Sequence, residues 1–248
     1  GDGDIQNEEL LYKLFGVNAE LLIDHAWGWE SCTIKDIKAY RPENKSIGSG
    51  QVLQSPYTTD RAKIVVLEMA DQLALDLMSK GFVTDRIVLT VGYDRENLND
   101  PKKINEYEGT VKIDHYGRLV PKHGHGTEPL REYTSSGRII TNAAGRLFDK
   151  TAENGLLIRR INLTAENVVP EGHKPKPAAE QIDLFTDYSE REKAESEKDY
   201  EREKEKKLQK AILDIKDKYG KNSILKGISL EDGATARDRN SQIGGHRA

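Results

Sequence analysis

The chain has one cysteine, no long apolar run and no strong charge excess, and each absence excludes a class of protein. Cys32 rules out an internal disulfide and suits a reducing cytosol; we expect a buried structural thiol rather than a nucleophile. No stretch approaches the length of a membrane-spanning helix, so we expect no membrane partner and a cytoplasmic location. The net charge of −4 lacks the basic excess typical of many nucleic-acid-binding proteins.

Recognisable catalytic motifs are also lacking. There is no Gly-rich phosphate loop followed by Lys, no Ser nucleophile elbow and no convincing strand-end pair of carboxylates for metal-assisted chemistry. His115, His123 and His125 could suggest zinc, but no cysteine supports them and surface histidines are commoner. The sequence therefore predicts no catalysis, no metal site and no cofactor in this chain.

Charge is distributed unevenly along the chain. Residues 1–44 carry −5, residues 45–170 carry +1 and residues 171–248 carry equal numbers of both signs. The apolar fraction of 36% is low and the charged fraction of 32% is high, so parts of the chain are expected to lie outside any core. Any contact with nucleic acid must then depend on local arrangement.

Residues 1–40 show apolar residues at helical spacing in two runs, which predicts a small helical hairpin. One interpretation is a packing unit. The other is a phosphate-binding helix start that uses the backbone N–H groups of Gly16, Val17 and Asn18. Residues 41–46 have the composition of a linker.

Residues 47–170 alternate strand and helix patterns. The predicted elements are strands at 47–54, 86–93, 125–132 and 156–163 and helices at 58–80 and 134–150. A polar excursion with a small hairpin interrupts the pattern between the second and third strands. We predict an α+β fold of the ferredoxin-like, split β-α-β-β-α-β kind, with a four-stranded sheet, both helices on one face and the other face open.

The open face is the first candidate binding surface. Side chains alternate across a strand, so Arg159 and Arg160 are expected to differ in direction, one reaching phosphates while the other pairs with an acid or works at the strand edge. A second group of small residues would let phosphates approach the backbone. The complete candidate set is Lys45, Ser46, Gly48, Ser49, Gly50, Lys122, His123, Arg159 and Arg160. Ordinary surface residues are the alternative.

After residue 170 the composition changes to a linker, 171–188, which contains QIDLF, and then to a charged segment, 189–248. The apolar residues of QIDLF either pack locally or fill a partner's pocket. A mixed-charge helix should follow, with Leu208, Ile212, Ile215 and Tyr219 as one amphipathic stripe ending at Gly220. Its role is either a solvated spacer or contact with a regulatory partner.

Several of these segments together resemble a known family. They are KSIGSGQVLQSPYT with its long helix, RIVLTVGYD, VPKHGHGT, the TSS-started helix and LLIRRINLT. The combination resembles the little finger of Y-family translesion DNA polymerases, in the UmuC/ImpB/MucB/SamB-like branch of Gram-positive bacteria. LLYKLFGVNAELLIDHAWGWE is similar to the end of that family's thumb.

The resemblance implies a non-catalytic, C-terminal part of a polymerase that acts in DNA repair and the SOS response. The palm, with its catalytic carboxylates and Mg²⁺, would precede residue 1. The little finger would grip the backbones of double-stranded template–primer DNA. A stand-alone adaptor whose sheet binds RNA or protein is the alternative, with Tyr93 as a candidate stacking residue.

QIDLF resembles the peptide by which bacterial polymerases dock on the sliding clamp. Gln181 can donate and accept at a pocket rim, Ile182 supplies the aliphatic position, and Asp183 precedes Leu184 and Phe185, which fill apolar pockets. Each buried apolar side chain gains about 1.5–3 kcal/mol. After the cost of ordering the segment, we expect an affinity of about micromolar.

Overall fold

The computed structural model describes residues 10–16, 18–30, 32–40, 46–114, 117–173, 188–243 and 246–247. The chain divides into two compact units, residues 1–43 and 44–248, and each is described by itself. Within the described residues, no helix combines the length and the apolar character needed to cross a bilayer.

The first unit is built of short helices. A helical stretch covers residues 10–15, α2 spans Asn18–Ala26 and α3 spans Ile34–Ala39. Gly16 ends the first stretch with φ of +57°, a conformation that costs glycine little. The sequence did not predict α3, which begins at a capping box between Thr33 and Asp36.

Cys32 in this unit is exposed, so the expectation of a buried thiol is wrong. It directly precedes the cap of α3, and its backbone N–H donates to Glu30 Oε1 at 2.9 Å. The local turn fixes its position, and no apolar layer covers it. Large apolar side chains of the unit, including Leu14 and Trp27, are exposed as well.

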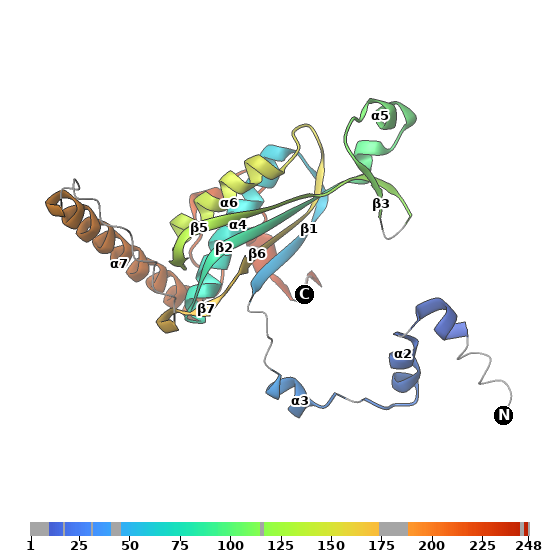
Figure 1. Ribbon diagram of the computed structural model, residues 1–248, viewed down its shortest axis with the longest axis horizontal. Coiled ribbons are helices and arrows are strands. Elements are labelled where there is room, and N and C mark those ends of the chain that lie inside the picture. Colours follow the sequence, from blue (N-terminus) through green and yellow to red (C-terminus); the bar gives the residue numbers. More distant parts are fainter. Residues whose placement is uncertain are drawn as a thin grey trace. The chain divides into compact units, whose positions relative to one another are not determined.

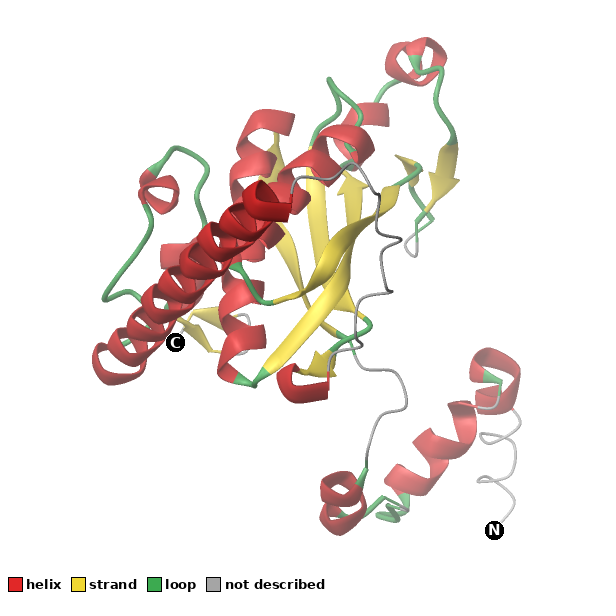
Figure 2. Ribbon diagram, turned by 60° about the vertical axis from the view of Figure 1, so that its left-hand side comes forward, coloured by secondary structure: helices red, strands yellow, loops and turns green. Residues whose placement is uncertain are grey.

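The second unit is organised around an antiparallel sheet (Figures 1 and 2). Its main elements are β1 (Ile47–Tyr57), α4 (Thr59–Ser79), β2 (Phe82–Tyr93), β5 (Gly124–Thr134), α6 (Gly137–Thr151) and β6 (Ile158–Glu166). The strand order is β1-β6-β2-β5, and a short β7 (Val169–Pro170) pairs with the start of β2. β6 therefore lies between the parallel β1 and β2, and β2 lies between the parallel β5 and β6, which confirms the predicted α+β fold with two split β-α-β units.

Helices α4 and α6 pack on the same face of the sheet and form the core with it. Leu73 and Leu77 of α4 and Phe148 of α6 meet Leu89 and Ile161 of the central strands, all almost fully buried. Ser136 caps α6, because its Oγ accepts a hydrogen bond from the backbone of Ile139 at 3.2 Å, as the TSS motif predicts.

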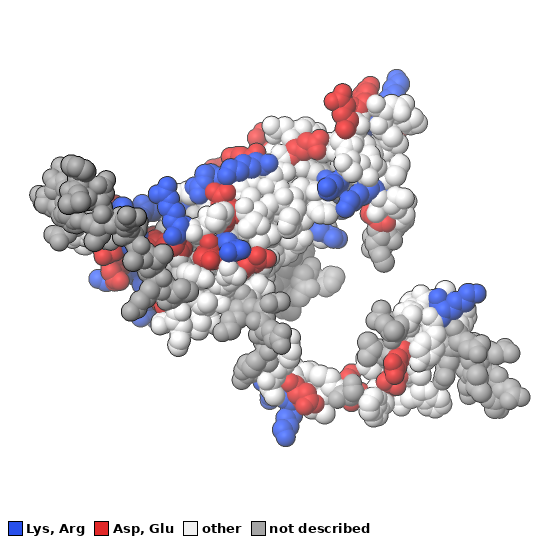
Figure 3. All heavy atoms as spheres, in the orientation of Figure 1, with Lys and Arg blue, Asp and Glu red and all other residues white. Residues whose placement is uncertain are grey.

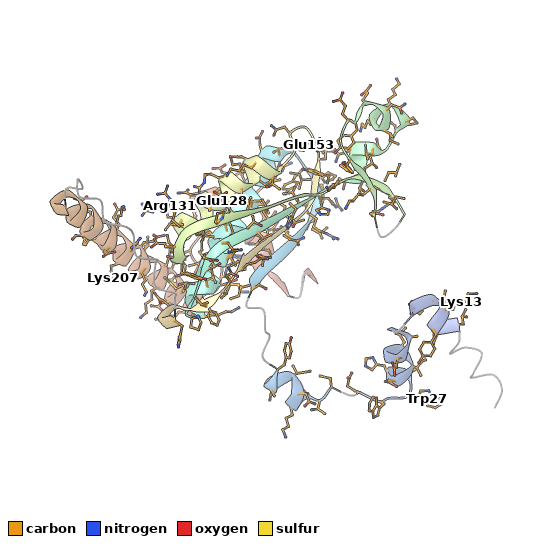
Figure 4. The ribbon with its side chains drawn as sticks, viewed as in Figure 1. Lys13, Trp27, Glu128, Arg131, Glu153 and Lys207 are labelled. Carbon is orange, nitrogen blue, oxygen red and sulfur yellow. The ribbon has the colours of Figure 1, made fainter. Side chains whose placement is uncertain are left out.

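Glu128 of β5 joins the sheet to α6 and gives a pH-dependent contribution to stability (Figure 4). Its carboxylate accepts hydrogen bonds from Lys150 Nζ at 3.0 Å and Arg146 Nε at 3.2 Å, and these hydrogen bonds lower the Glu128 pKa. A lowered pKa stabilises the fold above the unfolded-state pKa, and the contribution disappears as the pH falls through the folded-state value.

We expect Glu128→Gln to reduce the free energy of unfolding by about 0.5–1 kcal/mol at neutral pH, because both cations are largely exposed. The difference in the free energy of unfolding between wild type and variant should disappear as the pH falls below about 4. Urea denaturation at neutral and acidic pH measures both values. A difference that stays constant over this pH range would show that the ionised Glu128 carboxylate does not stabilise the fold.

An excursion of residues 94–123 separates β2 from β5 (Figure 1). It contains a 3₁₀ turn η1 (Arg95–Leu98), α5 (Pro101–Glu106) and a hairpin of β3 (Val111–Ile113) and β4 (Leu119–Pro121). The hairpin was predicted and α5 was not. Asn97 ties the excursion to Leu157, directly before β6, because its side chain donates to Leu157 O at 2.9 Å and accepts from Leu157 N at 2.8 Å.

The C-terminal segment belongs to the same compact unit as the sheet, and not to a separate tail. It contains α7 (Tyr188–Tyr219), η3 (Gly227–Leu230), α8 (Ala236–Asn240) and a hairpin of β8 (Gln242–Ile243) and β9 (His246–Arg247). A further 3₁₀ turn, η2 (Glu171–His173), follows β7. Helix α7 ends at Gly220 as predicted, with φ of +95°.

The predicted apolar stripe of α7 is covered only in part, since Leu208 and Ile212 line a cavity with Ile224 and Ala236. Leu208 and Tyr219 are 61% and 67% exposed, whereas Gln209 is buried. Polar contacts hold the helix as well: the Glu205 carboxylate accepts from Ser136 Oγ at 2.8 Å and from the backbone N of Arg138 at 2.9 Å. Charged contacts thus fasten α7 to the start of α6.

Candidate nucleic-acid interface

The face of the sheet opposite α4 and α6 carries small and polar side chains. The register places Gly50, Asn162, Thr90 and His125 in one row across the four main strands. Thr90 Oγ1 and His125 Nδ1 lie 2.9 Å apart in this row. The neighbouring row contains Gly48, Thr164, Val88 and Thr127. The side chains on this face are therefore short and polar, so the backbone of a ligand can approach the sheet closely.

Glycine is required at the two predicted positions of β1 by close contact with β6. A Cβ at residue 48 would lie 2.5 Å from Thr164 Oγ1, and one at residue 50 would overlap the side chain of Asn162. Both glycines are exposed, and β1 forms an edge of the sheet. Alternate backbone N–H groups of an antiparallel edge strand point away from its partner, so this strand can offer donors to a ligand.

Arg159 and Arg160 line the same cavity, which corrects the expectation that they face different sides. The register of β6 shifts at this point against both β1 and β2, as in a β-bulge. Ile158 and Ile161 on either side are both fully buried, so two residues occupy the space of one in the alternation. The bulge thereby adds a second arginine to the open side.

Arg159 has partners within the protein, whereas Arg160 has none among the residues described. Arg159 donates to Gln54 O at 3.0 Å, and its Nε lies 3.8 Å from Asp94 Oδ2. Arg160 makes no hydrogen bond or ion pair with any residue that the structure describes. Its guanidinium is exposed and available to an anion.

The cavity has a volume of about 640 Å³ and lies between the sheet and the excursion. Its lining residues are Val52, Gly92, Tyr93, Asp94, Arg95, Glu96, Asp114, Arg118, Val120, Arg159 and Arg160. Figure 3 shows basic side chains close to the place where the β3 hairpin leaves the sheet. Sequence reasoning missed Arg95 and Arg118, because an irregular polar segment has no periodicity that assigns it to a surface.

Tyr93 forms part of the support beneath this cavity. It is 7% exposed, its hydroxyl accepts from Glu153 N at 2.8 Å, and burial raises its pKa. Tyr107 of the excursion donates to Glu153 Oε2 at 3.2 Å; burial and this carboxylate raise the Tyr107 pKa to about 12. Figure 4 labels Glu153 at the end of the sheet that bears the excursion. Tyr93 is therefore placed to support the fold, and not to stack bases on the open face.

The remaining predicted residues are distributed as follows. Ser46, Lys122 and His123 are exposed, with Lys122 following β4. Gly16 is exposed, and Asn18 is the first residue of α2. The residues that fall outside the described part of the chain are Val17, Lys45, His115, Gln181, Ile182, Asp183, Leu184 and Phe185. The described residues contain no group of three or more His, Cys, Asp or Glu suited to a metal ion.

Comparison with known families assigns the second unit. Residues 44–184 match the model of the impB/mucB/samB family C-terminal domain. The chain therefore belongs to this family, which confirms the resemblance drawn from the sequence. It is also 25% identical over 242 residues to the putative UV-damage repair protein UvrX of Bacillus subtilis (strain 168), covering 97% of this chain and 47% of that protein. The chain thus spans about half the length of this curated relative.

Two solved structures show weaker similarity. One is the little finger domain of PolIV in complex with the beta-clamp processivity factor, with a TM-score of 0.33 and 10% identity over 57% of this chain and all of that chain. The other is an insertion ternary complex of Dbh DNA polymerase, with a TM-score of 0.32 and 14% identity over 65% of this chain and 38% of that chain. The family assignment rests on the sequence match to residues 44–184.

Proposed function

We propose that the second unit binds the backbone of double-stranded template–primer DNA through the open face of its sheet. The observation that carries this proposal is the bulge in β6, which turns Arg159 and Arg160 toward one cavity beside the exposed glycines of β1. Guanidinium groups and uncovered backbone suit phosphates and carry no sequence information. The unit would thus hold DNA without reading its bases.

Salt dependence tests this function directly. We expect the full chain to bind a template–primer duplex with an affinity that falls as salt rises, by a slope of about −0.9 per phosphate contacted. Arg160→Ala should reduce the magnitude of that slope by about one and weaken binding at every sequence tested. Fluorescence anisotropy titrations over a range of salt concentrations give both quantities.

Lys207→Ala is the matched control, because it removes the same charge from an exposed position on α7 (Figure 4). It should leave the slope unchanged. Equal slopes for wild type and Arg160→Ala, or a loss shared with Lys207→Ala, would place DNA binding elsewhere on the chain.

Recruitment is the second part of the proposal. Residues 181–185 would dock on a bacterial sliding clamp at about micromolar affinity, with Leu184 and Phe185 in apolar pockets and Gln181 at the rim. An affinity of this order permits exchange of polymerases on the clamp. The polymerase of which this chain would be a part would extend DNA past lesions with Mg²⁺ held by carboxylates outside it.

A further inference from the structure

The excursion of residues 94–123 adds a concave site to a sheet face that otherwise carries short side chains. Its wall consists of Arg95 and Glu96 of η1, Asp114 and Arg118 of the hairpin, and Val120 of β4. The opposite wall is formed by the sheet at Val52, Gly92 and the arginine pair of β6. This hollow can thus enclose a ligand at the edge of the interface just described.

The excursion is firmly supported at its base, so the hollow is preformed. Asp94 begins it with a backbone hydrogen bond to Leu157 O at 2.8 Å, and its carboxylate accepts from Glu96 N at 2.8 Å. Leu98 is buried, and Lys122 N donates to Thr110 O at 2.8 Å where the excursion returns. A preformed site loses little conformational entropy when it binds.

Two arginines of the hollow are paired with other residues that the structure describes, and two are not. Arg118 pairs with Asp114 at 2.6 Å and Arg159 is held by Asp94 and Gln54. Arg95 and Arg160 have no hydrogen bond or ion pair with the residues described. Two open guanidinium groups on opposite walls suit a single phosphate group or the planar face of a base.

The volume of the hollow and its exposed aliphatic side chains limit which ligands it can bind. A cavity of about 640 Å³ falls in the range that encloses a small molecule, so it can take one nucleotide and cannot take a duplex. Val52 is 59% exposed in the hollow, with Val120 across from it on the excursion. Exposed aliphatic side chains can pack against the apolar face of a base, while neighbouring guanidinium groups hold its phosphate.

We propose that this hollow holds one unpaired nucleotide of a DNA single strand that continues from the duplex, with its phosphate at Arg95 and Arg160 and its base between Val52 and Val120. The proposal rests on the duplex binding proposed above and adds a preference for a duplex with a single-stranded overhang. Arg95 of the excursion would supply that preference, whereas Arg160, which lies on the sheet side of the hollow, would contact the phosphate at the junction of paired and unpaired DNA and so contribute to both modes of binding.

The test compares a blunt duplex with the same duplex carrying an oligothymidylate overhang, each titrated against the full chain by fluorescence anisotropy. We expect wild type to bind the overhang form about tenfold more tightly. Arg95→Glu should reduce this preference to less than about twofold and change blunt-duplex affinity no more than Lys102→Glu does. Lys102 is an exposed residue of α5 that does not line the hollow, so its substitution makes the same change in charge within the excursion.

Two further titrations show whether the preference for the overhang comes from its bases, its phosphates or a single nucleotide. An overhang of abasic residues keeps the phosphates and lacks the bases, and it should lose most of the preference in wild type. Thymidine monophosphate should compete only at concentrations far above those of the overhang. Effective competition by the free nucleotide would overturn the proposal in favour of a mononucleotide site.

The failures of the two proposals are distinguishable. Equal affinity of wild type for the blunt and overhang forms would overturn the single-strand site and leave duplex binding intact. A preference that survives Arg95→Glu, in a variant whose circular dichroism is unchanged, would also overturn it. Binding of neither DNA form would reject both proposals.

Discussion

Replacing Leu184 and Phe185 by alanine is expected to weaken binding to a bacterial sliding clamp by at least about 100-fold. Each side chain contributes about 1.5–3 kcal/mol when it is buried in an apolar pocket, and every 1.4 kcal/mol corresponds to a tenfold change in the dissociation constant. A wild-type affinity of about micromolar would then fall out of the measurable range. Isothermal titration of the full chain against the clamp measures the change.

A matched variant removes two apolar side chains at exposed sites elsewhere. Tyr219→Ala/Leu230→Ala does this on α7 and η3, where the side chains are 67% and 72% exposed. It should bind the clamp as wild type does. Binding that is equal in all three proteins, or absent in wild type, would show that QIDLF does not recruit this chain.

Glu68→Ala is expected to reduce the free energy of unfolding of the full chain by about 2–4 kcal/mol. Glu68 is 4% exposed, and its Oε2 accepts from Thr235 N at 2.8 Å and Ala236 N at 3.1 Å at the start of α8. Burial lowers the pKa of Arg239, and the Glu68 carboxylate acts against that effect. The substitution leaves the two backbone donors of Thr235 and Ala236 without their acceptor and removes the carboxylate charge that favours the Arg239 cation.

Glu68→Ala in a shortened chain that ends at residue 187, and therefore lacks α7, η3 and α8, is the control. Without η3 and α8, Glu68 lies on the outer surface of α4, where a change to alanine should alter stability by less than about 0.5 kcal/mol. Urea denaturation of the four proteins forms a double-mutant cycle. An equal loss in the long and the short chain would contradict the docking of the C-terminal segment through Glu68.

The sequence was sufficient for the parts of the fold that bury apolar side chains locally. Alternating β-branched residues marked β2, and apolar residues at helical spacing marked α4, because both elements face one continuous core. Ser136 was identifiable as a cap from its own neighbours. These features depend on residues close together in the chain.

The parts that were missed depend on polar contacts between distant residues. Helix α7 contacts Ser136 through Glu205, and no local pattern in the sequence indicates a pairing between residues so far apart in the chain. The bulge at Arg159 was missed because period-two alternation assumes an unbroken register. In the candidate site this matters most, since the bulge brings the second arginine to the cavity.

The position of β6 in the sheet determines when the domain can assemble during synthesis. β6 pairs with both β1 and β2, with Ile161 opposite Gln51 on one side and Val91 on the other. β1 is synthesised first, yet its sheet partner is the last of the four main strands to leave the ribosome. Closing a loop of that length costs entropy before any contact repays it, so β1 has no sheet partner in the nascent chain until residue 166 has emerged.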